Sequence, residues 1–132
     1  MIALVAGVAL VGCGSRTQPR GVAKGAFESV VTRGGVRIEI RVAPNRVGVL
    51  NRFRVRVVRD ERALRRARVV TTLTMLGMPM GEPTYALGET APGVYTHTVP
   101  ALVMSGRWRL SFSVAPHDGD PLSVEVVDRV DR

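Results

Sequence analysis

The stretch "VRIEIRV", residues 36–42, alternates aliphatic and charged side chains. Successive side chains of a β-strand point to opposite faces, so the segment predicts a strand with one buried and one solvated face. The segments "RFRVRVV" (residues 52–58) and "RWRLSFSV" (residues 107–114) repeat the pattern. The inward positions of the three strands are expected to share one core: Val36, Ile38, Ile40, Val42, Phe53, Val55, Val57, Trp108, Leu110, Phe112 and Val114.

Turn-forming residues separate these segments from further predicted strands at 27–32, 68–75, 94–99 and 122–130. Gly34-Gly35 suits a tight hairpin, and Pro92-Gly93 fits the central pair of a type II turn. Residues 59–69, "RDERALRRARV", lie between two strands, so their first half is interpreted as an exposed loop with at most one helical turn. About seven short antiparallel strands are typical of an all-β, immunoglobulin-like β-sandwich.

The N-terminal segment "MIALVAGVALVGC" is apolar but too short to cross a bilayer as a mature helix. Its end, Leu10-Val11-Gly12-Cys13, resembles a bacterial lipoprotein signal. We therefore expect a signal peptide over residues 1–12, a lipidated Cys13 and flexible tether over 13–25, and the β-sandwich domain over 26–132. This organisation predicts an extracytoplasmic protein attached to a bacterial membrane by its lipid, with no internal disulfide because Cys13 is its one cysteine.

The net charge of +8 at pH 7 raises the hypothesis of nucleic-acid binding. The arginines, however, are spread over many predicted strands instead of forming one block, and export argues against such a partner. We expect no nucleic-acid partner, and attraction to anionic lipid headgroups as a secondary effect of the charge.

Residues for nucleophilic catalysis are not apparent in the sequence. No serine lies in a Gly-x-Ser-x-Gly elbow, and no His/Cys spacing matches a zinc site. The stretch from His117 to Asp120 is interpreted as an Asp-Gly turn with polar neighbours. The sequence therefore predicts a protein that is not an enzyme.

Three methionines, Met75, Met78 and Met80, lie within "TLTMLGMPMGEP", residues 72–83. Thioethers are soft ligands that favour Cu(I) over zinc, calcium or magnesium. A bend at this strand end would bring Met78 and Met80 together, and His97 and Met104 could approach from a neighbouring connection. The alternative is that these methionines fill irregular gaps in the core.

Two stretches, "TMLGMPMGEP" (residues 74–83) and "PGVYTHTVPALVMSGRWRLSFSV" (residues 92–114), resemble the YtkA-like domain family, which is related to the FixH-type proteins. The matching positions are the Met-rich segment after a central strand, then Gly93-Val94-Tyr95, then the run from Met104 to Trp108. The preceding "NRFRVRVVRD" fits as well, and the resemblance covers roughly residues 36–115. It implies a small immunoglobulin-like sandwich outside a bacterial membrane, associated with copper handling or respiratory-oxidase assembly.

Taken together, these features predict a membrane-anchored, non-enzymatic β-sandwich that binds Cu(I) and passes it to, or withholds it from, a partner. A membrane protein in copper delivery or oxidase assembly is the expected partner. The predicted ligands are Met78, Met80 and Met104, with His97 as a nitrogen ligand and Met75 in reserve. The alternative is a metal-free interaction module that docks on a membrane or envelope complex.

Overall fold

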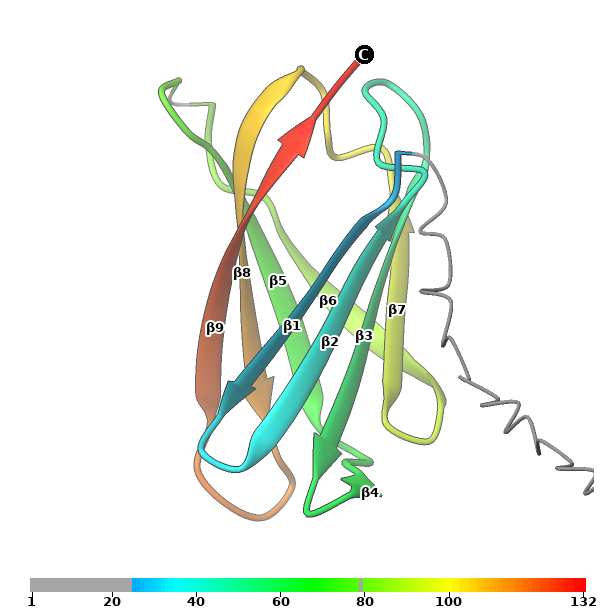
Figure 1. Ribbon diagram of the computed structural model, residues 1–132, viewed down its shortest axis with the longest axis vertical. Helices are drawn as coiled ribbons and strands as arrows, with labels where there is room; N and C mark the ends of the chain where they lie inside the picture. Colours follow the sequence, from blue (N-terminus) through cyan, green and yellow to red (C-terminus); the bar gives the residue numbers. More distant parts are fainter. Residues whose placement is uncertain (1–24, 79) are drawn as a thin grey trace, which may run out of the picture.

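The computed structural model describes residues 25–78 and 80–132. No helix in these ranges is long and apolar enough to cross a membrane. The described residues form nine strands in the order β1 (Phe27–Arg33), β2 (Val36–Ala43), β3 (Asn51–Arg59), β4 (Arg62–Ala63), β5 (Arg68–Met75), β6 (Thr84–Ala91), β7 (Val94–Val99), β8 (Gly106–Ala115) and β9 (Leu122–Val130) (Figure 1).

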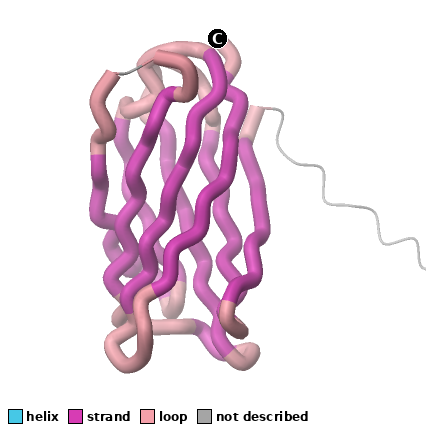
Figure 2. The backbone as a smooth tube through the Cα atoms, turned by 90° about the vertical axis from the view of Figure 1, so that its left-hand side faces the viewer, coloured by secondary structure: helices cyan, strands magenta, loops and turns pink. Residues whose placement is uncertain are grey.

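The strands join in one antiparallel sheet with the order β1-β2-β3-β7-β6-β5-β8-β9, and β4 pairs with β3. The sheet curls until its first and last strands approach each other, as the two views in Figures 1 and 2 show. Arg33 Nη1 of β1 donates a hydrogen bond to the Ser123 carbonyl of β9 at 2.8 Å. The prediction of an antiparallel all-β fold is therefore confirmed, and the sheet forms a nearly closed barrel.

The structure differs from the predicted seven-stranded sandwich at β6. The first half of β6 pairs with β5, from Thr84 to Leu87, and the second half pairs with β7, from Gly88 to Ala91. A strand that changes partners in this way joins two layers into one continuous sheet. The segment 59–69 contains the two-residue β4 and no helical turn.

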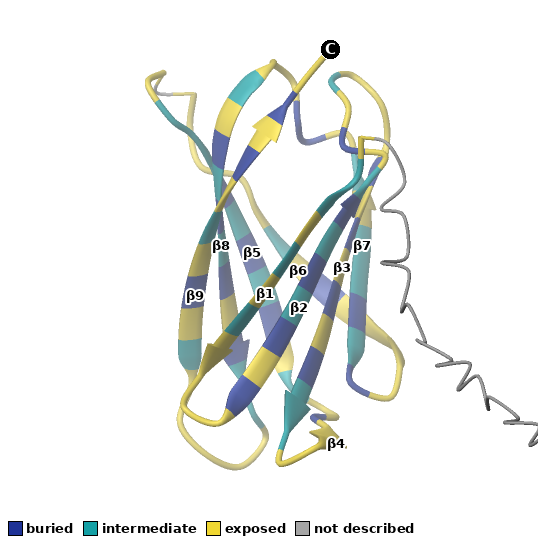
Figure 3. Ribbon diagram, viewed as in Figure 1, coloured by how far each residue is buried: buried dark blue, intermediate teal, exposed yellow. Residues whose placement is uncertain are grey.

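The predicted core is confirmed in full. All eleven inward positions of β2, β3 and β8 are at most 3% exposed, including the Trp108 ring. Figure 3 shows the resulting bands of buried and exposed residues along the strands. Cross-strand neighbours share a face, so Val42 lies beside Phe53 and Ile40 beside Val55. Burial of this face against the opposite side of the barrel supplies the main stabilisation of the fold.

Two glycine turns fit their predicted roles. Gly34 and Gly35 both have positive φ, 57° and 76°, and close a two-residue hairpin between β1 and β2. Gly93 has φ 70° in the turn from β6 to β7. A Cβ at Gly93 would lie 2.9 Å from both the Val57 carbonyl oxygen and the Ala63 Cβ, so a larger residue would displace β3 or β4.

Three connections lie at one end of the barrel: residues 44–50, 76–83 and 100–105, drawn at the top in Figure 1. The described chain also begins there, because a Cβ at Gly25 would lie 3.1 Å from the Pro44 carbonyl oxygen. The predicted signal peptide, Cys13 and nearly all of the tether lie outside the described residues and stay predictions.

Candidate metal centre

The methionine segment forms a loop, residues 76–83, that is tied to its surroundings at both ends. The Leu76 amide donates to the Arg107 carbonyl at 2.9 Å, which fixes the end of β5 beside the start of β8. Across the loop, Thr74 Oγ1 donates to Glu82 Oε1 at 3.2 Å. The two loop glycines have φ of 84° and 81°, values that residues with a Cβ rarely adopt. The loop therefore reverses direction at the barrel end.

Three of the predicted ligands lie together. Met75, Met78 and Met80 line one open depression, which we call the methionine depression. The side chains of Met78 and Met80 are 44% and 42% exposed. Met75 is partly buried and packs against the core. The structure therefore favours gap filling for Met75, whereas Met78 and Met80 are exposed and do not fill the core.

Met104 lies on the neighbouring connection and is 37% exposed. Its carbonyl accepts a hydrogen bond from Trp108 Nε1 at 3.0 Å, which fixes the backbone of the connection over the core. Met80 and Val103 border a second depression, beside the methionine depression. The two methionine-bearing loops are thus neighbours, although Met104 itself lines neither depression.

His97 stacks on Tyr85, which lines the second depression. It lies on β7 opposite Phe53, and its ring stacks on Tyr85 with centroids 5.3 Å apart and an interplanar angle of 27°. Tyr85 in turn borders the second depression together with Met80. The structure thus places His97 one side chain away from the methionine loop, and Tyr85 is a site residue that sequence reasoning missed because β6 was not recognised.

Two charged residues in the methionine depression were also missed. Glu82 and Arg109 line it beside the thioethers. Arg109 alternates with the buried residues of β8, and Glu82 lies in a segment that was interpreted only for its methionines. The carboxylate favours a bound cation and the guanidinium opposes one. Within the described ranges, no group of three His, Cys, Asp or Glu side chains could hold a metal.

Asn51 organises the connection of residues 44–50 at the same end. Its fully buried side chain donates from Nδ2 to the carbonyls of Arg46 (2.8 Å) and Val49 (3.2 Å). Its Oδ1 accepts from the Arg46 amide at 3.1 Å. The Gly48 amide donates to the Leu102 carbonyl at 3.2 Å, which joins this connection to the one that carries Met104.

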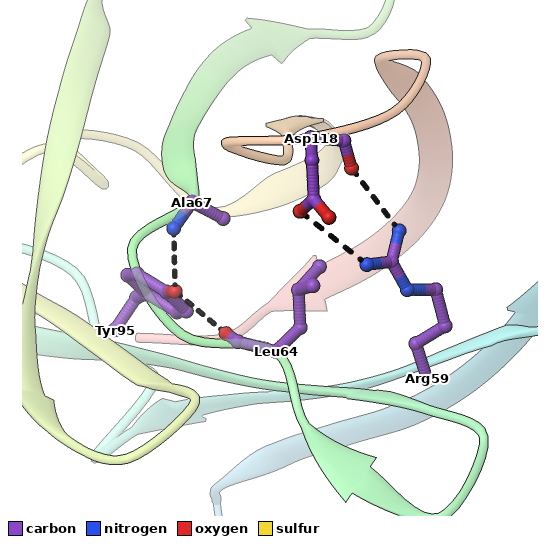
Figure 4. A network of polar contacts seen from close by, with 5 residues as sticks. All are labelled: Arg59, Leu64, Ala67, Tyr95 and Asp118. Atoms are coloured by element: carbon purple, nitrogen blue, oxygen red, sulfur yellow. Dashed lines mark hydrogen bonds and ion pairs between the residues drawn. The ribbon is translucent and has the colours of Figure 1, made fainter.

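The opposite end is fixed by polar contacts of two side chains, Tyr95 and Arg59, shown in Figure 4. The buried Tyr95 hydroxyl donates to the Leu64 carbonyl at 2.7 Å and accepts from the Ala67 amide at 2.9 Å. Burial raises the pKa of Tyr95, so the hydroxyl keeps its proton as a donor. Arg59 Nη1 donates to the Asp118 carbonyl at 3.3 Å, and Arg59 Nη2 lies 3.6 Å from Asp118 Oδ1. These contacts hold the loop connections of the barrel.

Comparison with known proteins identifies one family. A family model described as YtkA-like matches residues 31–113, from within β1 to within β8. The match includes the methionine loop, both depressions and the connection that carries Met104. No curated protein and no solved structure shows significant similarity to the chain.

Proposed function

Because the chain belongs to the YtkA-like family, we propose that it is an extracytoplasmic, membrane-anchored protein that binds Cu(I). In this proposal it passes the ion to, or withholds it from, a membrane protein in copper delivery or oxidase assembly. Met78 and Met80 are the central ligands, with Met104 as the third sulfur. Met75 stays in reserve at the core side, and His97 is a supplementary nitrogen ligand.

The observation that carries the proposal is the exposure of three methionine residues. A methionine that fills the core is buried, whereas Met78, Met80 and Met104 are each more than a third exposed at one end of the barrel. Two of them share a depression with Met75, so three methionine residues line one space. Apolar side chains held at a rim in this way are available to an incoming ion or partner.

The donor set fits a soft monovalent ion. Thioethers bind Cu(I) in preference to hard cations and carry no proton to be displaced, so binding would not depend on deprotonating the ligands. Outside the cytoplasm a pair of cysteines tends to form a disulfide, which thioethers do not. Glu82 supplies a negative charge beside the sulfurs and would favour the ion electrostatically.

Competition with a chromophoric Cu(I) chelator tests the proposal, using the whole chain under reducing conditions. Met78→Leu/Met80→Leu removes two sulfurs and conserves apolar volume, so stability should change by less than about 1.5 kcal/mol per site. The affinity for Cu(I) should nevertheless fall by about tenfold or more, which corresponds to about 1.4 kcal/mol of lost binding free energy. Zn(II) should not compete, because the described site offers neither a thiolate nor a His cluster.

The matched control is Val103→Ser. Val103 is 52% exposed beside Met80, and its replacement leaves every sulfur in place. Copper affinity should be unchanged in this variant. A wild-type protein that takes up no Cu(I) would favour the metal-free docking module instead. A double variant that binds Cu(I) as tightly as the wild type would show that Met78 and Met80 are not its ligands.

The membrane anchor is tested separately at Cys13. Mass spectrometry of the mature N-terminus should find a diacylglyceryl cysteine, because the motif from Leu10 to Cys13 places that residue at the cleavage point. Cys13→Ser should release the protein from the membrane fraction in a high-salt wash, which screens any contact between arginines and lipid headgroups. A variant that remains fully attached would contradict the lipid anchor without affecting the copper proposal.

A further inference from the structure

The exposed apolar residues are distributed unevenly over the barrel. Eight large hydrophobic side chains in the described ranges are exposed, and two of them, Val30 and Val127, lie within strands. The other six lie on the three connections at one end. We call these six the apolar rim: Val49, Leu50, Met78, Met80, Val103 and Met104.

The apolar rim is joined through contacts between its three connections. The Gly48–Leu102 hydrogen bond connects the segment of Val49 and Leu50 to that of Val103 and Met104. Val103 and Met80 border the same depression, which connects the third segment. Leu50 is the most exposed member, at 62%. Three of the six carry no sulfur, so copper binding does not account for their exposure.

Arginines flank the apolar rim. Arg46, Arg129 and Arg132 line one depression at this end, together with Asp131, and Arg107 is exposed beside Met104. The opposite end has a different character: its connections carry Asp60, Glu61, Asp118 and Asp120 among their arginines, and none of the eight exposed hydrophobic side chains. Aliphatic side chains surrounded by cations are the chemistry that an anionic bilayer surface accepts.

The position where the described chain begins is consistent with a membrane at this end of the barrel. Gly25 lies against the connection of residues 44–50, so the described chain begins at the same end as the apolar rim. On the proposed anchoring at Cys13, the eleven residues from 14 to 24 could extend at most about 40 Å. The anchored end of the barrel would then be the end with the apolar rim.

We infer that the apolar rim is a membrane-contact surface. Val49, Leu50 and Val103 enter the interfacial region of an anionic bilayer, while the flanking arginines meet lipid headgroups. The inference rests on the proposed anchoring for its direction. It implies that the thioethers of Met78 and Met80 are presented next to the membrane, where a membrane-embedded copper partner is within reach.

The test locates each end of the barrel relative to a bilayer. Cys13→Ser removes the one cysteine of the whole chain, and Leu50→Cys or Glu61→Cys then introduces a single site for an environment-sensitive fluorophore. The vesicles contain phosphatidylcholine with about one-third phosphatidylglycerol, or phosphatidylcholine alone as the charge control. The label at residue 50 should shift to the blue and be quenched by nitroxide lipids on anionic vesicles, and the label at residue 61 should do neither.

A second variant separates this inference from copper binding. Val49→Ser/Leu50→Ser keeps all four methionines of residues 75–104, so its affinity for Cu(I) should stay within about twofold of the wild type. With a label introduced by Val103→Cys in the Cys13→Ser background, the serine pair should reduce the lipid quenching at least severalfold. The copper affinity of the serine pair is measured without the label, so the copper proposal and the membrane inference can each be refuted without the other.

Three results would overturn the inference. The label at residue 50 could remain in water although the chain sediments with anionic vesicles. The labels at residues 50 and 61 could be quenched equally. A blue shift at residue 50 that grows with protein concentration in the absence of vesicles would assign the apolar rim to a second copy of the chain.

Discussion

At the residue scale, Asp128 is a buried carboxyl group that lacks part of its hydrogen bonding. It is 1% exposed on β9, and its Oδ1 accepts one hydrogen bond from Asn45 Nδ2 at 3.0 Å. Its Oδ2 and the Oδ1 of Asn45 are both buried and without partners among the described residues. Burial raises the pKa of Asp128, against the smaller lowering effect of the Asn45 hydrogen bond. A proton on Asp128 Oδ2 would provide the donor that this site lacks.

Because the folded-state pKa of Asp128 is raised, its contribution to the free energy of unfolding decreases as pH rises. The folded protein holds the Asp128 proton at pH values where the unfolded chain has lost it, so this group's contribution to stability is fully present below the unfolded pKa of about 3.9. It is lost as pH rises through the folded-state pKa. Asp128→Asn supplies an Nδ2–H donor without a charge, and it should raise stability at pH 7 by about 1 kcal/mol.

Urea unfolding of wild type and Asp128→Asn at several pH values between about 3 and 7 measures the effect. The stability difference should grow in favour of the variant as pH rises. Since all other carboxyl groups are common to both proteins, their contributions cancel in the difference. A variant that is less stable than the wild type at pH 7 would show that the native site stabilises the charged carboxylate.

At the scale of strands, alternation of side chains is informative only where a strand contributes several inward residues. β2, β3 and β8 each place at least three large apolar residues in the core, so their pattern predicts both the strands and the buried face. β6 places only Tyr85 and Leu87 inward before Gly88, and the rest of the strand is exposed. Its pairing with two different strands is a property of the folded sheet that no local pattern contains.

The connection between β4 and β5 depends on one side chain from a distant strand. Tyr95→Phe keeps the ring in the core but removes the hydroxyl that pairs with Leu64 and Ala67. The buried Leu64 carbonyl and the partly buried Ala67 amide then lack a partner, so stability should fall by about 1–3 kcal/mol. Tyr85→Phe, at a partly buried ring of the same type, is the control and should change stability by less than about 0.5 kcal/mol.

Urea unfolding of the two variants makes the comparison. Amide hydrogen exchange adds a local readout, since Ala67 should lose protection in Tyr95→Phe and keep it in Tyr85→Phe. Equal stability of Tyr95→Phe and wild type would mean that water replaces the hydroxyl and that the connection does not depend on it.

At the scale of the whole molecule, the candidate site is a product of strand order. The sequence shows that Met75, Met78 and Met80 are close along the chain, and a bend there was enough to predict that Met78 and Met80 meet, with Met75 in reserve. It does not show that residues 44–50, 76–83 and 100–105 lie at one end, because that requires the path β3-β7-β6-β5-β8. The exposure of Met78, Met80 and Met104 is also set by the tertiary structure. It distinguishes a metal ligand from a core-packing methionine better than the spacing of the methionines along the sequence does.

The central claim is that these exposed thioethers hold copper. X-ray absorption at the copper edge tests it most directly, on the whole chain loaded with about one equivalent of Cu(I) and freed of unbound metal. The account predicts retained copper whose nearest neighbours include at least two sulfur atoms, from Met78 and Met80 of the methionine depression. Loss of the copper during desalting, or a first shell built from nitrogen and oxygen alone, would contradict it.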